Sequence, residues 1–200
     1  MPDPAYSPRS GTASDRRLYN LLGALSTGLT DAVHEATSAS AQLDEAAAVA
    51  LIALLDFSPK GSIRRLGQVL GLTHSGTVRM VDRLVNAGYV GRKAGQDARS
   101  RSPRLTASGA RAARRVRIAR EEAIARTLGA LSESERVTLT RLCERLISAI
   151  TEHRLESRAA GVPPMGGALC RMCDFGACGR DQGRCPAEKA AAAWTGRKTK

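Results

Sequence analysis

The chain has 200 residues, of which 31 are Lys or Arg and 19 are Asp or Glu, so its formal net charge is +12 and its pI is about 10.4. This length suits one globular domain with appendages, and the charge makes a polyanion the expected partner. No apolar run approaches the roughly 18 residues of a membrane span, and the N-terminus lacks the apolar region of a signal peptide, so we expect a cytoplasmic protein with no membrane partner. Only 3% of residues are aromatic, which argues against stacking on single strands and favours a helix in the groove of double-stranded DNA.

The first part of the chain predicts a tail followed by two helices. Residues 1–13 are rich in proline and poor in apolar side chains, which is typical of a disordered tail. From about Asp15 to Ala36, apolar residues recur at steps of three and four and predict a long amphipathic helix. The segment from Leu43 to Phe57 is apolar on nearly every face, so we expect a buried helix that ends at Ser58-Pro59-Lys60-Gly61.

Two short helices joined by a glycine-containing turn come next. Ser62 is a typical N-cap for the first helix, and Gly71 a typical C-terminal glycine. Thr73 caps the second helix, which Ala87 and Gly88 end. This spacing predicts a helix-turn-helix, with the helix from about Thr73 to Ala87 in the major groove.

A β-hairpin is predicted directly after the second short helix. The segments 89–93 and 101–106 flank a polar stretch at 94–100, and the hairpin is strongly basic. Pro103 places the second strand at an edge, as in the two-stranded wing of a winged helix.

Two long helices follow the predicted wing. The first runs from Ala107 to about Leu128, and the second begins at Ser132, which forms a capping box with Glu135, and extends to about Leu155. The second helix carries an apolar stripe, as does the first helix of the chain. Together the stripes exceed what one compact core needs, so the helices pack on each other or against a second chain.

This order of elements resembles the MarR family of bacterial regulators. The matching strings are Leu72-Thr73-His74-Ser75-Gly76-Thr77-Val78-Arg79-Met80-Val81-Asp82-Arg83-Leu84, Asn86-Ala87-Gly88-Tyr89-Val90, and Leu105-Thr106 followed by Gly109. The resemblance covers about Asp15 to His153. It implies a mainly α fold with a small β wing, a winged helix-turn-helix with long N- and C-terminal dimerisation helices, and a homodimer on a palindromic operator. The wing keeps only Asp97 and Arg99 of the family's usual Asp-Asp-Arg-Arg run.

Candidate DNA contacts lie at the start of the recognition helix and in the wing. They are Thr73, His74, Ser75, Gly76, Thr77, Arg79, Arg83, Arg99 and Arg101. Arg79 suits a bidentate contact with guanine, which contributes about 1–3 kcal/mol of discrimination, whereas wing arginines suit phosphates or the minor groove. The alternative for Arg79 and Arg83 is an ordinary solvated side chain. The basic run Arg111, Arg114 and Arg115 is either a phosphate contact or a solvated face.

Four cysteines gather near the C-terminus, in residues 155–200, which we separate from a DNA-binding and dimerisation domain at 14–154. Cys170, Cys173, Cys178 and Cys185 form C-x2-C-x4-C-x6-C, a spacing that suits a zinc site or an iron–sulfur cluster. Spacing does not separate these two cofactors, and thiols that form disulfides on oxidation are a third possibility. The fifth, Cys143, is in phase with the apolar stripe, so we expect it to be buried.

Two other function classes compete with a regulator. A thiol oxidoreductase could use the C-x2-C pair, but the βαβ pattern that such enzymes need is not predicted around it, so we expect no enzyme. A structural protein could bind nucleic acid through charge alone, without sequence preference. We favour a sequence-specific regulator whose cysteine centre senses metal or redox state.

Overall fold

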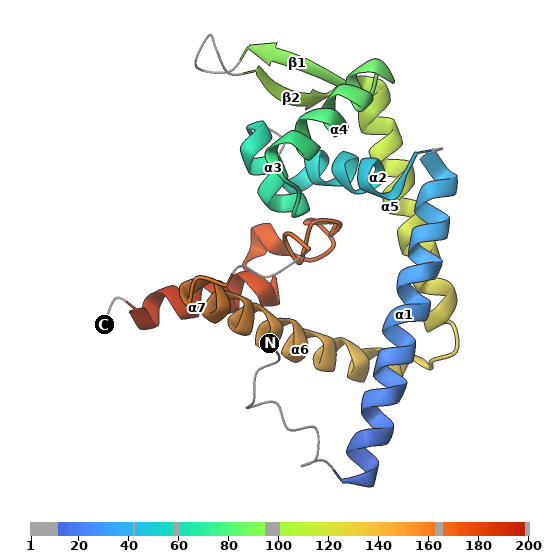
Figure 1. Cartoon of the computed structure of the whole chain (residues 1–200). Coiled ribbons are helices and arrows are strands. Elements are labelled where there is room, and N and C mark those ends of the chain that lie inside the picture. The colour runs from blue at the N-terminus through green and yellow to red at the C-terminus, as the bar shows by residue number, and fades with distance from the viewer. Residues whose placement is uncertain (1–11, 42, 58–60, 95–100, 163–165, 199–200) are drawn as a thin grey trace.

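The computed structural model describes residues 12–41, 43–57, 61–94, 101–162 and 166–198 (Figure 1). The elements are α1 (Ala13–Ala41), α2 (Glu45–Ile52), the π-helical turn η1 (Ala53–Phe57), α3 (Ile63–Leu70), α4 (His74–Asn86), β1 (Val90–Ala94), β2 (Arg101–Leu105), α5 (Ala107–Leu128), α6 (Glu133–Ala159), the 3-10 turn η2 (Arg180–Gln182) and α7 (Pro186–Lys198). The described part of the chain is thus mainly helical with one antiparallel two-stranded sheet. The predicted fold class, a mainly α protein with a small β wing, is confirmed.

The core lies where α2, α3, α4 and the start of α5 meet. Leu51 of α2, Leu66 of α3, Val81 and Leu84 of α4 and Ala112 of α5 are at most 1% exposed and belong to one cluster. Burial of these apolar side chains supplies the main driving force for assembling the unit. The core therefore gives the exposed side of α4 a rigid support.

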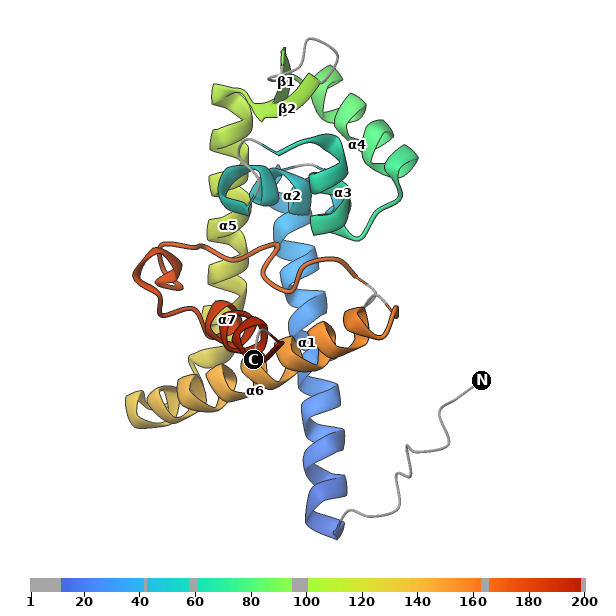
Figure 2. The same cartoon turned by 90° about the vertical axis from the view of Figure 1, so that its left-hand side faces the viewer.

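A second layer consists of two long helices side by side. In Figures 1 and 2, α1 runs along α5, and its N-terminal half projects beyond the loop that joins α5 to α6. This projecting half is apolar but exposed, with side chains 49–62% exposed at Leu18, Tyr19, Leu21, Leu22 and Leu25. The same is true of α6, where four large apolar side chains are 46–55% exposed: Val137, Leu142, Leu146 and Ile150.

The helices differ from the prediction in four places. Helix α1 continues to Ala41 and α6 to Ala159, beyond the expected ends at Ala36 and about Leu155, so α6 crosses the expected domain boundary at 154. The expected single helix up to Phe57 changes from α to π geometry at Ala53. Helix α7 was not predicted, because its alanine-rich sequence has no apolar periodicity that distinguishes a helix from a linker. The expected tail at 1–13 falls almost wholly outside the described residues.

The cysteine segment folds back onto the rest of the molecule. In both views the chain from Gly166 to Cys185 lies between the winged helix-turn-helix and α6, and α7 packs along α6. No single helix among the described residues is long and apolar enough to cross a membrane, although α1 together with the strongly bent continuation Glu45–Phe57 passes on length and composition. Most of that continuation is buried in the core.

Candidate nucleic-acid interface and thiol cluster

The turn between α3 and α4 is built from local capping interactions. Ser62 accepts a hydrogen bond from the Arg65 N–H at the start of α3, and Thr73 accepts one from the Gly76 N–H at the start of α4. Gly71 ends α3 in the left-handed region, at φ 70°. These residues fulfil the predicted capping roles, because each satisfies backbone groups that helix ends leave unpaired.

Close packing between α3 and α4 depends on Gly67. A β-carbon at this position would lie 2.7 Å from the hydroxyl oxygen of Thr77, so only glycine lets the two helices approach this closely. Thr77 itself is fully buried, and its hydroxyl donates to the Thr73 carbonyl. The side chain of Thr77, one of the predicted DNA contacts, therefore fills the space that Gly67 leaves and does not lie on the accessible side of α4.

The remaining candidates on α4 lie on its accessible side. The side chains of Thr73, His74, Ser75 and Arg79 are exposed, and Gly76 is half-buried within the first turn. On the opposite side, Met80 and the neighbouring core residues are buried. The N-terminal end of α4 thus presents hydroxyl, imidazole and guanidinium groups to solvent, which are groups that bind base edges and phosphates.

Arg83 has a partner within the protein. Its guanidinium donates to the Asp44 carboxylate, and Asp44 also caps α2 by accepting from the Ala47 N–H at 2.9 Å. Burial acts to raise the pKa of Asp44, but the hydrogen bonds from Ala47 and Arg83 outweigh it, so the pKa lies below its ordinary value. The ion pair joins α4 to the start of α2, and both side chains remain accessible.

The predicted wing is confirmed as a hairpin. Val90 pairs with Leu105 and Arg92 with Pro103, so Pro103 lies in an edge strand as expected. The Thr106 hydroxyl donates to the Gly88 carbonyl at 2.8 Å, which closes the base of the hairpin against the end of α4. The predicted contact Arg99 lies outside the described residues, and of Arg101 only the backbone, which begins β2, is described.

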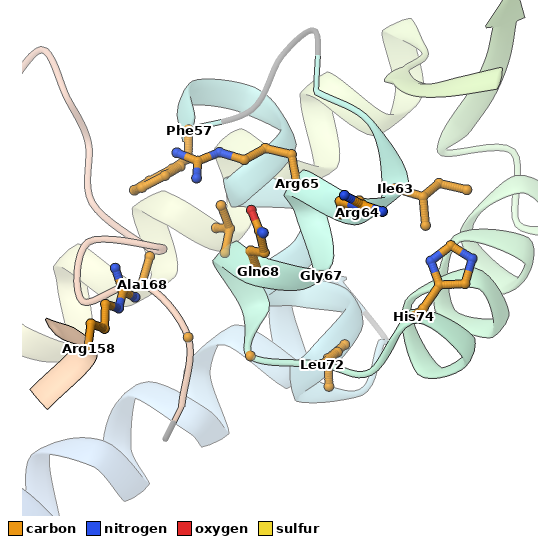
Figure 3. A pocket seen from close by; sticks show the side chains of 13 residues that line it. Phe57, Ile63, Arg64, Arg65, Gly67, Gln68, Leu72, His74, Arg158 and Ala168 are labelled. Carbon is orange, nitrogen blue, oxygen red and sulfur yellow. The ribbon is translucent and has the colours of Figure 1, made fainter. Parts of the chain in front are cut away.

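A basic pocket lies between the helix-turn-helix and the cysteine segment. Its volume is about 780 Å³, and Figure 3 shows Arg64, Arg65 and Gln68 of α3 on one side, with Arg158 and Ala168 on the other. No acidic side chain occurs among the described residues that line it. The pocket is therefore lined by positive side chains from both the helix-turn-helix and α6.

The thiols of the C-terminal segment influence one another in two pairs, Cys170 with Cys173 and Cys178 with Cys185. The interaction with the Cys170 thiol lowers the pKa of Cys173 to about 7, with burial opposing and Arg120 and Arg180 contributing, and the same interaction raises the pKa of Cys170. Burial, followed by the interaction with Cys185, raises the pKa of Cys178 to about 11.

The two pairs are near each other but not in metal-binding geometry. Cys170 interacts electrostatically with both members of the second pair, yet no three His, Cys, Asp or Glu side chains in the described ranges are arranged to hold a metal ion. All five cysteines are thiols. Cys143 is exposed on α6, so its predicted burial is wrong for the single chain, because none of the described residues covers that face of the helix.

An ion-pair bridge and an aromatic pair hold the segment in place, and neither was expected from the sequence analysis. Arg117 of α5 donates to Asp56 of η1 at 2.9 Å and lies 3.2 Å from the Asp174 carboxylate, with all three side chains 22–25% exposed. Phe175 meets Phe57 edge to face, with ring centroids 5.4 Å apart. A further contact comes from Met172, which packs against the small core cluster of Ala48, Ile52 and Val116. The only sequence signal was an acid followed by an aromatic residue inside the cysteine loop.

These elements define a winged helix-turn-helix with long flanking helices, and comparisons with known proteins agree. No protein-family model matches the chain, and no curated protein matches its sequence. A MarR family protein from Bacillus stearothermophilus is similar in structure, with a TM-score of 0.60, 26% identity, and coverage of 69% of this chain and 96% of that one. The MarR family protein Rv2887 from Mycobacterium tuberculosis has a TM-score of 0.52, 27% identity, and coverage of 67% and 96%.

A third structure of this fold was solved with nucleic acid. Sco3205, a MarR family transcriptional regulator from Streptomyces coelicolor, was solved in complex with DNA; its TM-score is 0.55, its identity 21%, and the coverage 72% of this chain and 91% of that one. The chain thus has the fold of MarR family transcriptional regulators. Of these neighbours, Sco3205 is described as a transcriptional regulator. The described residues around Cys170 and Cys173 form turns.

Proposed function

We propose that this protein is a sequence-specific, double-stranded DNA-binding transcriptional regulator that acts in the cytoplasm. The observation that carries the proposal is helix α4, which is anchored by a fully buried face while its N-terminal end exposes Thr73, Ser75 and Arg79. A helix held in this way fits the major groove, and the net charge of +12 supplies the attraction to phosphates. The DNA complex of Sco3205 is a precedent for the same fold.

The proposed active form is a homodimer on a palindromic operator. The exposed apolar faces of α1 and α6 support it, because contiguous apolar surface on two long helices is stabilised by burial against a second copy. Cys143 lies on α6 and would be covered by the partner in such a dimer. A two-fold axis would then present two copies of α4 to half-sites about one helical turn of DNA apart.

We further propose that the four cysteines bind zinc or an iron–sulfur cluster and make DNA binding respond to metal or redox state. Four thiols in two neighbouring pairs provide the donor set of either centre, and a low pKa at Cys173 favours the thiolate that ligation requires. Because the pairs are not arranged around a common point, a four-thiolate centre requires the pairs to approach each other. Metal binding would therefore change the shape of the segment.

DNA recognition is tested by comparing Arg79→Ala with Arg141→Ala on an operator selected from random DNA. Both substitutions remove one exposed positive charge, but Arg141 lies on α6. We expect Arg79→Ala to weaken operator binding by about 1–3 kcal/mol and to relax preference at one base position. Arg141→Ala should leave the preference unchanged. Equal effects of both variants would contradict the assignment of α4 as the reading helix.

The cysteine centre is tested on protein purified without oxygen. A broad absorbance band near 400 nm with bound iron would indicate an iron–sulfur cluster, and a colourless protein with stoichiometric metal would indicate zinc. Cys173→Ser should lose the metal and the metal-dependent change in operator affinity, whereas Cys143→Ser should keep both. Equal operator affinity under reducing, oxidising and chelating conditions would refute the sensing role.

A further inference from the structure

One peptide group links three parts of the molecule that are distant in sequence. It is the unit between Gly167 and Ala168, at the start of the cysteine segment. Its carbonyl accepts a hydrogen bond from the Arg154 guanidinium of α6, and its N–H donates to the Val69 carbonyl of α3 at 2.7 Å. The same peptide group therefore binds the proposed dimerisation helix on one side and the helix-turn-helix on the other.

The contact with the helix-turn-helix is a direct approach of two backbones. A β-carbon at Gly167 would lie 2.4 Å from the Val69 carbonyl oxygen and 2.5 Å from the Gly71 nitrogen. Gly71 is the residue that ends α3, and two residues later Thr73 caps α4. A displacement of the Gly167 backbone thus acts on the turn that sets the position of α4.

On the other side of the contact, Ala168 is directly connected to the turn that contains the first thiols. Ala168 accepts a hydrogen bond from the Arg171 N–H at 3.3 Å, so it belongs to the first turn of the cysteine segment, two residues before Cys170. Further along, Asp174 is held by Arg117 of α5. Because Arg117 holds Asp174 against α5, a rearrangement of Cys170 and Cys173 would displace the chain on the side of Gly167.

The turn also has room to move. The basic pocket of about 780 Å³ is lined by Gly71, Leu72 and His74 on the side of the turn and by Gly167 and Ala168 on the side of the cysteine segment (Figure 3). Close-packed interiors resist displacement, whereas a turn that borders an open pocket can shift without displacing packed side chains.

We propose that the Gly167–Ala168 peptide group is the coupling element through which the state of the cysteine cluster changes the position of α4 and hence operator affinity. This inference rests on the proposed sensing function and names its route. Cys170, Cys173, Cys178 and Cys185 would hold the metal, and their approach to one another would displace the segment at Ala168 and, through Val69 and Gly71, the cap of α4. The hydrogen bond from Arg154 ties the Gly167 carbonyl to α6, so the movement takes place relative to α6.

Gly167→Ala and Gly166→Ala form a matched pair for the test. Both glycines have positive φ, 74° and 84°, so both substitutions carry the same backbone strain, but a β-carbon at Gly166 meets nothing within 4 Å. Operator affinity is measured for each full-length variant without metal, after addition of Zn²⁺, and after reconstitution with iron and sulfide in the absence of oxygen. Hydrogen exchange reports whether the Ala168 amide is still protected.

We expect wild type and Gly166→Ala to change affinity by about 5-fold or more between the metal-free state and one loaded state, as for a typical allosteric coupling. Gly167→Ala should lose protection at Ala168, keep its metal content, and bind the operator equally in all states. Arg154→Ala, which frees the same peptide group without adding an atom, should reduce the response as well. Its charge-matched control, Arg141→Ala at an exposed position on the same helix, should not.

The outcomes separate the two proposals. A response of wild-type size in both Gly167→Ala and Arg154→Ala would overturn the coupling route and leave metal sensing intact. If wild type itself showed no change in either loaded state, the sensing function would fail and the coupling with it, while DNA recognition by α4 would stand on its own test.

Discussion

The proposed dimer makes a quantitative prediction for the apolar face of α6. Leu146 is 51% exposed in the single chain, so about half of its surface is still available for burial. Full burial of a leucine contributes about 1.5–3 kcal/mol, so Leu146→Ala should remove about 1 kcal/mol from each copy. A two-fold axis counts the loss twice, and the dimer should weaken by about 2 kcal/mol, which is roughly a 30-fold increase in Kd.

Sedimentation equilibrium over a range of concentrations measures this Kd directly. Leu25→Ala on α1, where the leucine is 50% exposed, should have a similar effect. Val162→Ala is the control, because Val162 is 65% exposed but lies beyond the end of α6. An unchanged Kd in both leucine variants, or an equal loss in the control, would refute the assignment of these faces to the dimer.

Three further substitutions test other parts of the structure. Asp44→Ala removes the cap of α2 and should cost about 1 kcal/mol of unfolding free energy in urea at neutral pH. Because the fold lowers the pKa of Asp44, its carboxylate stabilises the protein fully at pH values above its ordinary pKa of 3.8, and this contribution is lost as the pH falls through the lower folded pKa. If wild type and Asp44→Ala already had the same free energy of unfolding at pH 6, this reasoning would be contradicted. Arg117→Ala leaves two carboxylates without their shared cation and should speed limited proteolysis within the cysteine segment at least several-fold, whereas Arg114→Ala, at an exposed position on the same helix, should not. Gly109→Ala would place a β-carbon 1.9 Å from the Tyr89 carbonyl oxygen and should lower the free energy of unfolding by about 1–3 kcal/mol or more, whereas Gly91→Ala meets nothing within 4 Å and should change it far less.

The helix-turn-helix could be predicted from sequence because its signals are local. Ser62, Gly71 and Thr73 each act on backbone groups within four residues, and the sequence contains both the residue and its target. The burial of Thr77 could not be predicted in the same way. It depends on Gly67, ten positions earlier, which faces Thr77 only after α3 and α4 have packed.

For the cysteine segment, the sequence predicts the thiols of the site but not the residues that position the segment. The spacing of its thiols is visible in the sequence and indicates a metal centre, but the residues that position the segment are Asp56, Phe57 and Arg117, which are more than fifty residues away. Hydrophobic periodicity does not predict such contacts, because each depends on a single side chain of a helix or turn that forms independently of the contact.

A sensor requires both a responsive centre and a physical connection to the element it controls. Cysteine spacing alone suggests the centre and leaves the connection open, so a flexible tail with a metal site would fit the sequence equally well. The two glycines, Gly71 and Gly167, distinguish these cases, since a β-carbon at either would lie 2.4–2.5 Å from backbone atoms of the other segment. Their approach makes the cysteine segment a part of the helix-turn-helix surface, and for that reason we place the control of DNA binding at this contact and not at the dimer interface.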